Sequence, residues 1–217
     1  MIYLIDYDAG NLLSIKRALN FLNFKFLTVQ KINNISSNDL LLIPGVGSFA
    51  HASTRIKKSG LFEIANQNPR NRPFIVGICL GMQLLMKQGF EGGESEGLNL
   101  IDGSVESIFS KKPKNLDIPK TIIGWQNYEL TENINHNYKW LNNYEGNSFY
   151  HVHSYMCIPK NPKNIYATYP DKLSFIPNII GDSKKKVLGF QFHPEKSGQK
   201  GLNFLKEVLN SYFLITN

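Results

Sequence analysis

The sequence predicts an open, three-layer α/β fold, in which a mostly parallel β-sheet lies between helices and gains antiparallel strands in the second half. Three observations support this. The apolar runs of the first half are continuous, as in strands buried on both faces of a parallel sheet. Amphipathic helical spacings alternate with these runs. The second half has short aromatic and β-branched segments separated by turn residues. The length of 217 residues suits one domain, 1–217.

In the first half, strands and helices alternate along the chain. Leu12, Ile15 and Leu19 have the spacing of one apolar helix face. The apolar run LLLI is stopped by Pro44 and Gly45, which are typical turn residues. The expected elements are strands at 2–6, 24–29, 40–43 and 73–78, and helices at 12–22, around 57–66 and from residue 80 onward.

The second half changes character. SVESIF, GWQNYEL, NSFYHVHSY and IYATYP are short and rich in aromatic or β-branched residues, so we expect them to be antiparallel additions to the sheet. KVLGFQF (186–192) is again a continuous apolar run and predicts a buried strand. An amphipathic pattern over 199–214 predicts a closing helix.

The charge pattern bears on the choice of partner. The formal net charge is +7, but the lysines occur in short scattered groups such as KKPK (111–114) and KKK (184–186). Nucleic-acid-binding domains gather their basic residues on one face. Nucleic acid is therefore disfavoured, while an acidic protein surface or a phosphorylated ligand remains open.

The cysteines and apolar runs bear on location. Cys79 and Cys157 are too few for a disulfide framework. The N-terminal MIYLIDYDAG has no basic leader, and the longest apolar run, around 74–86, is too short to span a bilayer. We therefore expect a cytoplasmic protein that does not enter the membrane.

Cys79 lies at the centre of Gly77-Ile78-Cys79-Leu80-Gly81, after a predicted strand and before a predicted helix. This is the spacing of a strand-to-helix elbow that presents a nucleophile, with glycines where side chains would collide with neighbouring backbone. The first N–H groups of the following helix favour a thiolate. The alternative is a buried structural cysteine beside incidental glycines.

A second motif, GFQFHPEKS (189–197), places His193 and Glu195 directly after a buried strand. A histidine can act as general base for a thiol nucleophile, and a carboxylate can orient it. Alone, His-x-Glu is a weak signal. Together with the cysteine elbow at the end of another parallel strand, it describes a Cys-His-Glu triad.

A third motif, PGVGSF (44–49), follows the strand LLLI. Glycine-rich loops can turn several backbone N–H groups toward one point and so bind an anion. The alternative is an ordinary strand-to-helix turn. Beside a nucleophile, the loop is a natural source of one oxyanion-hole N–H, with the N–H of Leu80 as the other.

Six motifs together give the chain a family resemblance. The motifs DYDAGNLLS, PGVGSFA, GICLGMQLL, GLNLIDG, YHVHSY and GFQFHPEKSGQKG occur in this order and cover essentially the whole chain. The chain thus resembles the class I (triad) glutamine amidotransferases and, among them, the glutaminase subunits of imidazole glycerol phosphate synthase. The pairing of D-Y-x-x-G-N with H-P-E-K-S is more specific than the triad.

The resemblance implies hydrolysis of glutamine to glutamate and ammonia, with no metal and no other cofactor. Cys79 would attack the side-chain amide, His193 would move protons and Glu195 would orient His193. The oxyanion would be held by the N–H groups of Val46 and Leu80, on a loop shaped by Gly45 and Gly47. By the same resemblance, glutamine would be held by Gln83, Glu91, Tyr150 and the segment His153, Ser154 and Tyr155. Because GFEGGESEG has three glutamates, Glu94 and Glu96 remain alternatives to Glu91.

The resemblance also implies a partner. The family docks on a (βα)8-barrel cyclase, which uses the ammonia to make imidazole glycerol phosphate and AICAR in histidine biosynthesis, and Asn11, Trp125 and Lys196 match positions of that docking face. Each residue also has an ordinary interpretation: a helix cap for Asn11, a core aromatic for Trp125 and a solvated charge for Lys196.

One departure from the family pattern leaves the ammonia acceptor open. Where the family usually has Pro-His-Met-Gly-Trp-Asn, this chain has TIIGWQ (121–126). One alternative is a paralogue that supplies ammonia to a sugar-amidating enzyme of surface polysaccharide synthesis. Others are a hydrolase of a different amide and a catalytically silent regulatory module.

Four further residues are given no catalytic role. His51 and His136 are expected on the surface, Cys157 in the core, and Asp6 in support of the 44–49 loop.

Overall fold

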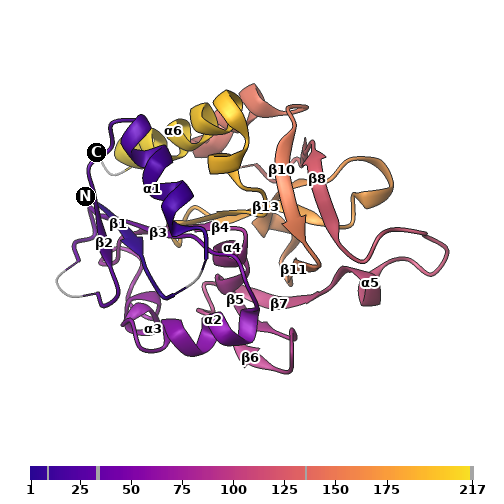
Figure 1. Cartoon of the computed structure of the whole chain (residues 1–217), viewed down its shortest axis with the longest axis horizontal. Coiled ribbons are helices and arrows are strands. Elements are labelled where there is room, and N and C mark those ends of the chain that lie inside the picture. Colours follow the sequence, from indigo (N-terminus) through magenta and orange to yellow (C-terminus); the bar gives the residue numbers. More distant parts are fainter. Residues whose placement is uncertain (9, 33–34, 135, 216–217) are drawn as a thin grey trace.

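A computed structural model of the chain describes residues 1–8, 10–32, 35–134 and 136–215. Its central sheet runs through the molecule and carries parallel strands on one side and antiparallel strands on the other (Figure 1). The parallel strands, in spatial order, are β2 (Phe26–Val29), β1 (Ile2–Ile5), β3 (Leu40–Ile43), β4 (Phe74–Ile78) and β14 (Val187–Phe190). The antiparallel continuation is β13 (Pro177–Asp182), β12 (Ile165–Thr168) and β9 (Glu129–Leu130).

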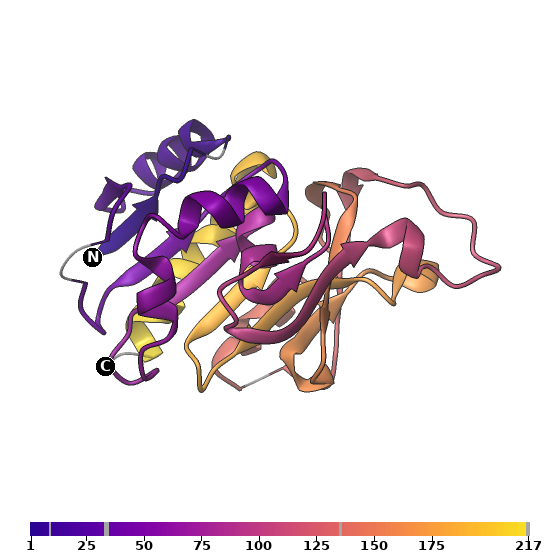
Figure 2. The same cartoon turned by 90° about the horizontal axis from the view of Figure 1, so that it is seen from below.

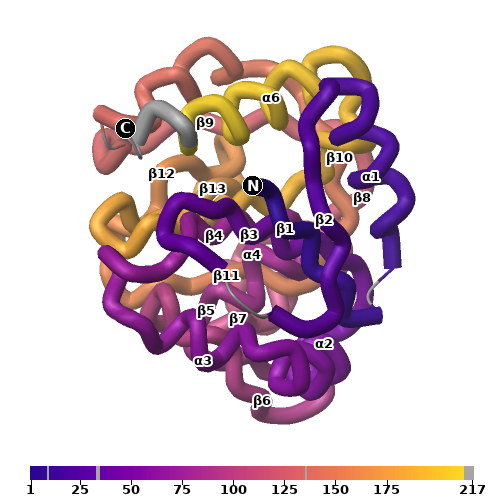
Figure 3. Tube along the Cα trace, turned by 90° about the vertical axis from the view of Figure 1, so that its left-hand side faces the viewer, coloured from indigo at the N-terminus to yellow at the C-terminus, as the bar shows by residue number. Residues whose placement is uncertain are grey.

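Helices cover both faces of this sheet, which confirms the predicted open α/β fold (Figures 1 and 3). Alternate residues of the strands enter different cores: Leu40 and Leu42 of β3 face one layer, whereas Leu41 and Ile43 face the other. One layer holds α1 (Leu12–Phe21), the 3-10 segment η1 (His136–Tyr144) and α6 (Gly198–Ile215). The other holds α2 (Phe49–Ile56), α3 (Leu61–Ala65) and α4 (Leu80–Leu84).

Several strands between residues 86 and 159 form two separate sheets beside the central one (Figure 2). The strand-forming character of SVESIF and NSFYHVHSY is confirmed, but their predicted addition to the central sheet is wrong. The alternation of apolar and polar residues predicts a strand but does not specify which strand it pairs with. The separate strands are β11 (Tyr155–Pro159), β7 (Ile101–Ser107), β5 (Met86–Gly89) and β6 (Ser95–Glu96) in one sheet, and β10 (Phe149–His153) with β8 (Ile122–Gln126) in another.

Two helix predictions differ from the structure. The helix expected around 57–66 is reduced to α3, because residues 57–60 form a turn in which Gly60 has a φ of 85°. The preceding helix α2 (Phe49–Ile56) was not predicted. The helix expected from residue 80 ends at Leu84, because Met86–Gly89 pairs with β7 as strand β5. Tertiary pairing overrides the helical preference of these residues.

Short helical segments complete the described chain. They are α5 (Ile108–Lys111) and the 3-10 turns η2 (Pro162–Asn164), η3 (Asp171–Leu173) and η4 (Pro194–Lys196). Within the described residues, no helix combines the length and the apolar character needed to cross a bilayer.

Candidate active site

Cys79 lies at the sharp turn between β4 and α4, as predicted. It has a φ of 53° and a ψ of −108°, a backbone conformation that side-chain-bearing residues rarely adopt. A β-carbon at Gly81 would collide with the carbonyl oxygen of Ile43, and one at Gly77 would collide with that of Gly81. The backbone N–H of Cys79 donates to the carbonyl of Phe190, at 2.9 Å, which ties the elbow to β14. The glycines thus permit the close approach that holds Cys79 in place.

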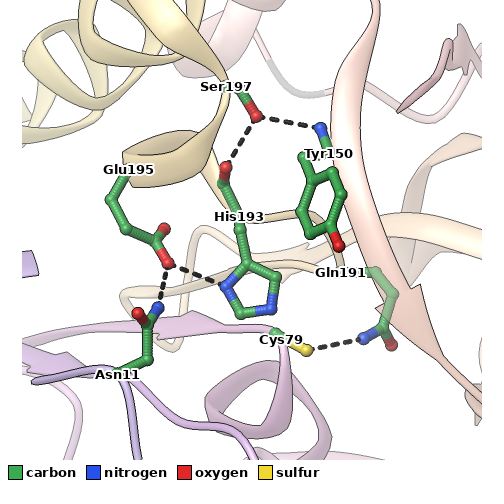
Figure 4. A network of polar contacts seen from close by, with 7 residues as sticks. All are labelled: Asn11, Cys79, Tyr150, Gln191, His193, Glu195 and Ser197. Carbon is green, nitrogen blue, oxygen red and sulfur yellow. Dashed lines mark hydrogen bonds and ion pairs between the residues drawn. The ribbon is translucent and has the colours of Figure 1, made fainter. Parts of the chain in front are cut away.

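His193 and Glu195 lie beside Cys79, at the adjoining end of β14. Nδ1 of His193 is 2.8 Å from Oε1 of Glu195, and both side chains are fully buried. Figure 4 shows the Nε2 edge of the imidazole facing the sulfur of Cys79. Burial lowers the pKa of His193, but the Cys79 thiolate and the Glu195 carboxylate outweigh it and raise that pKa to about 10. The arrangement therefore favours a protonated imidazole at His193, beside the sulfur of Cys79.

Asn11 contacts this cluster directly. It occupies the N-cap position of α1 with a left-handed backbone, but its side chain does not cap the helix. Instead, its amide Nδ2 donates to Oε1 of Glu195, the oxygen that also faces His193 (Figure 4). The helix-cap interpretation of Asn11 is therefore wrong, and its side chain connects the start of α1 to Glu195.

Two further residues that sequence reasoning missed hold the cluster. Gln191 is fully buried, and its Nε2 lies 3.5 Å from Sγ of Cys79. The Ser197 hydroxyl accepts from the N–H of Tyr150 at 2.9 Å and donates to the carbonyl of His193 at 2.6 Å. A glutamine in a buried strand run, two residues before His193 and thus on the same face of an extended chain, was the available signal for Gln191. Ser197 gave no comparable signal.

A cavity of about 270 Å³ opens beside Cys79. Gln83 projects into it from α4, and its Nε2 lies 3.3 Å from the carbonyl of Tyr155 and from Oε1 of Gln191. The Thr121 hydroxyl, which was not predicted at the pocket, is 2.6 Å from that of Ser154. The lining residues are Val46, Gly47, Cys79, Leu80, Gln83, Glu91, Thr121, Val152, His153, Ser154 and Tyr155.

Glu91 is the glutamate of its segment that reaches this cavity. Glu94 and Glu96 line a different hollow, beside Phe62 and Lys87. Glu96 also forms an ion pair with Lys57, at 2.8 Å. Of the three glutamates left open by the sequence, Glu91 alone is therefore placed within reach of a ligand beside Cys79.

The predicted oxyanion loop borders the cavity through Val46 and Gly47. Gly47 has a φ of 126°, which favours glycine. Gly45 is buried against the ring of Tyr7, whose hydroxyl donates to the carbonyl of Pro44. Asp6, expected to support this loop, instead accepts from the N–H of Asp8 at 3.2 Å. The support comes from Tyr7.

The other predicted residues lie around the cavity or apart from it. Tyr150 is not among the lining residues, and its ring packs edge-on against Trp125, with centroids 6.2 Å apart. Trp125 is 56% exposed, and Lys196 is exposed as well. Trp125 is thus not a core aromatic. Both residues are accessible for docking.

The histidines and cysteine without a predicted catalytic role behave as expected. His51 and His136 are exposed, and Cys157 is fully buried. Burial also raises the pKa of the Cys157 thiol. Nε2 of His153 lies 2.6 Å from the Tyr169 hydroxyl. Burial lowers the pKa of His153 to about 4. Cys79 is therefore the cysteine placed for chemistry.

The described residues contain no cluster of three or more His, Cys, Asp or Glu side chains that could hold a metal ion. The donor set at the cavity consists of a thiol, an imidazole, amides, hydroxyls and one carboxylate.

Comparisons with known proteins agree with this geometry. The family model described as glutamine amidotransferase class-I matches residues 3–210. "Imidazole glycerol phosphate synthase subunit HisH" of Carboxydothermus hydrogenoformans is 39% identical over 210 residues, which cover 96% of this chain and 98% of that protein. The protein of the same name from Lactococcus lactis subsp. lactis is 37% identical over 209 residues, covering 96% and 97%.

Solved structures show the same fold. "Structure of PurLQS from Thermotoga maritima" superposes with a TM-score of 0.66 at 17% identity, covering 96% of this chain and 97% of that one. "Crystal structure of glutamine amidotransferase" superposes with a TM-score of 0.65 at 16% identity, covering 98% and 100%. The resemblance predicted from the motifs is thereby confirmed: the chain belongs to the class-I glutamine amidotransferase family, in the branch that holds the HisH proteins.

Proposed function

We propose that the chain, as a single domain over residues 1–217, is the glutaminase subunit of an imidazole glycerol phosphate synthase. It hydrolyses glutamine and passes the ammonia to a (βα)8-barrel cyclase. The cyclase makes imidazole glycerol phosphate and AICAR in histidine biosynthesis, and both subunits act in the cytoplasm. The names of its relatives support this assignment. The observation that carries the glutaminase chemistry is Cys79, held at a strained elbow above a cavity and faced by the His193–Glu195 pair.

The first half of the proposed reaction forms a thioester. The Cys79 thiolate attacks the side-chain amide carbon of glutamine, and the carbonyl oxygen gains the negative charge. The N–H groups of Val46 and Leu80 stabilise this oxyanion. His193, protonated at neutral pH because its pKa is raised, gives its Nε2 proton to the amide nitrogen. The carbon–nitrogen bond breaks and ammonia leaves.

The second half releases glutamate. His193 is now neutral and accepts a proton from water as the water oxygen attacks the thioester carbon. The resulting tetrahedral adduct collapses, the carbon–sulfur bond breaks, and glutamate leaves with Cys79 again a thiolate. Glu195 keeps the imidazole in one orientation and stabilises its positive charge through the 2.8 Å contact at Nδ1.

The cavity residues suit an amino-acid substrate. Gln83, Glu91 and the His153–Tyr155 segment bring an amide, a carboxylate and backbone groups to the space beside Cys79. We assign Glu91 to the α-ammonium group and the backbone segment to the α-carboxylate. Asn11, Trp125, Tyr150 and Lys196 lie toward the proposed docking face, where the ammonia must leave without being protonated by solvent.

The test uses the purified chain together with its cognate cyclase. Glutamate release from glutamine is measured for the wild type and for Cys79→Ser, and cyclase turnover is measured with ammonium salt. We expect glutamate from the wild type alone and ammonium-dependent turnover with both. Retained glutaminase activity in Cys79→Ser would remove Cys79 from the mechanism.

Complementation tests the pathway. The gene is expressed, with the cognate cyclase gene, in a histidine auxotroph that lacks its own glutaminase subunit. Growth without histidine at low ammonium is the expected result. Failure to grow, despite protein that hydrolyses glutamine, would point to a different ammonia acceptor.

A further inference from the structure

The loop between β3 and α2, which carries Val46, is fixed at its two ends. The Tyr7 hydroxyl donates to the carbonyl of Pro44 at the start of the loop. At its end, the backbone N–H of Phe49 donates to Oε2 of Glu91 at 2.7 Å. Between these points, Gly45, Val46 and Gly47 make no hydrogen bond to another described residue. The orientation of the Val46 peptide therefore depends on how firmly the two ends are held.

Glu91 belongs to a different part of the chain from the loop it holds. It follows β5 and lies 42 residues from Phe49 in sequence. Phe49 is the first residue of α2, so its N–H has no partner within the helix. A carboxylate at this position is favoured by the helix dipole and forms a charge-assisted hydrogen bond. The contact is therefore a strong one for an otherwise unpaired N–H.

The same carboxylate borders the cavity beside Cys79. Glu91 is half-buried and lines the cavity together with Val46 and Gly47. Its Oε2 is bonded to Phe49, whereas its Oε1 makes no hydrogen bond to a described residue. One oxygen therefore holds the loop while the other is available to a cationic group of the substrate.

We propose that Glu91 is a positioning residue for the oxyanion loop, and that it couples binding of the substrate's α-ammonium group to the placement of the Val46 N–H. The coupling rests on the proposed glutaminase function. An ammonium group on Oε1 fixes the carboxylate, and the fixed carboxylate fixes Phe49 and the loop before it. With an amide substrate that has no ammonium group, Oε1 stays unpaired and the loop is held only by the Phe49 contact, so turnover is slow even when that substrate saturates the cavity.

Two substitutions separate the two tasks of Glu91. Glu91→Gln keeps an acceptor oxygen for the Phe49 N–H but loses the charge that binds an ammonium group. Glu91→Ala loses both. Glu94→Ala, three residues away and outside the cavity, is the matched control. kcat and KM for glutamine are measured for all four proteins in complex with the cyclase, after circular dichroism has shown equal helix content.

Binding of the ammonium group by Glu91 should affect KM, whereas its positioning of the loop should affect kcat. Both Glu91 variants should raise KM by about tenfold or more, the usual effect of losing a hydrogen bond to a charged group. In Glu91→Ala, kcat should fall by a further factor of about ten, whereas Glu91→Gln should retain most of it. Glu94→Ala should match the wild type. Equal kcat values in Glu91→Ala and Glu91→Gln would overturn the positioning role.

A second measurement does not depend on catalysis. Hydrogen exchange of the Phe49 backbone amide is followed by NMR in the free chain without glutamine. Glu91→Ala should accelerate this exchange by about tenfold or more, and Glu91→Gln should accelerate it less. Unchanged exchange in Glu91→Ala would overturn the contact. A wild-type complex that releases no glutamate while Phe49 remains protected would instead refute the proposed function and leave the contact standing.

Discussion

At the scale of single residues, the chemistry proposed for Cys79 depends on the charges beside its sulfur. Cys79 and Cys157 are both buried, but only Cys79 has a histidine and a helix N-terminus beside it. His193 is buried without losing its proton, because the thiolate and Glu195 compensate for its desolvation. Its neighbours His151 and His153 have pKa values lowered by burial and stay neutral. The positive charge is thus confined to His193.

The charge pairing predicts how His193 responds to loss of the thiol. In Cys79→Ala, the pKa of His193 should fall from about 10, because burial then opposes only the Glu195 carboxylate. NMR titration of the imidazole, assigned with a His193→Gln variant, measures this shift. A midpoint that is the same in both proteins would mean that the thiolate does not raise this pKa.

The sign of the accompanying stability effect follows from the same shift. The folded pKa of His193 lies above its ordinary 6.5, so the folded state binds the proton more tightly than the unfolded state does. This stabilisation is complete below pH about 6.5 and is lost as the pH rises through about 10. Cys79→Ala should lose less stability than the wild type over that interval in denaturant titrations.

Not every contact of the site could be predicted at this scale. The motifs identify Cys79, His193 and Glu195 because short-range spacing defines an elbow and a strand end. The bond from Asn11 to Glu195 joins residues 184 positions apart, and it depends on how α1 and η4 pack together. Asn11 was assigned to the docking face by resemblance, and its contact with Glu195 had no local signal.

At the scale of elements, the elbow depends on the close approach of α4 to β3 and β4. Gly81→Ala should cost more than about 3 kcal/mol of folding free energy, since its β-carbon would meet the rigid backbone carbonyl of Ile43. Gly146→Ala is the control: its φ of 74° is strained for alanine, but nothing lies within 4 Å. That variant should lose only about 1 kcal/mol.

Urea unfolding followed by tryptophan fluorescence measures both glycine variants. Trp140 packs against Phe204 of α6 and reports on the core. Equal losses of stability in Gly81→Ala and Gly146→Ala would show that the tight packing of the elbow has no special energetic role.

Strands and helices are predicted correctly from the sequence where a single local residue pattern determines the element. The continuous apolar strands β1, β3, β4 and β14 were all found in the sequence because burial on both faces leaves no polar positions. The prediction that the helix continues beyond α4 was wrong, because Met86–Gly89 pairs with a strand that lies later in the chain. Pairing partners are set by tertiary packing, which local patterns do not contain.

At the scale of the molecule, the proposed docking surface is defined by Trp125 and Ile123 of β8. The two residues are 56% and 63% exposed, and the two-residue period of a strand places their side chains on one face of β8. Both belong to TIIGWQ, the segment that departs from the family pattern. The sequence indicated a change in this region, and the structure adds that Ile123 presents apolar area there.

Trp125→Ala should weaken the complex with the cyclase by about tenfold or more, as expected for an aromatic anchor of an interface. The isolated chain should fold normally, since the side chain is mostly exposed. Leu27→Ala is the control, because Leu27 is 50% exposed but lies on β2 at the opposite end of the molecule (Figure 1). Calorimetric titration with the cyclase measures the affinity of both variants. Equal affinities of Trp125→Ala and Leu27→Ala would place the interface elsewhere.

The central claim is that Cys79 carries the glutamyl group during turnover. Its most direct test is acid quenching of the complex with the cyclase during steady-state glutamine hydrolysis, followed by peptide mass spectrometry. Cys79 and Cys157 are the two cysteines of the chain, so the site of modification is unambiguous. We predict a glutamyl thioester on the Cys79 peptide of the wild type and none on the Cys157 peptide. Turnover with the adduct on Cys157, or undiminished turnover in Cys79→Ser, would contradict the claim.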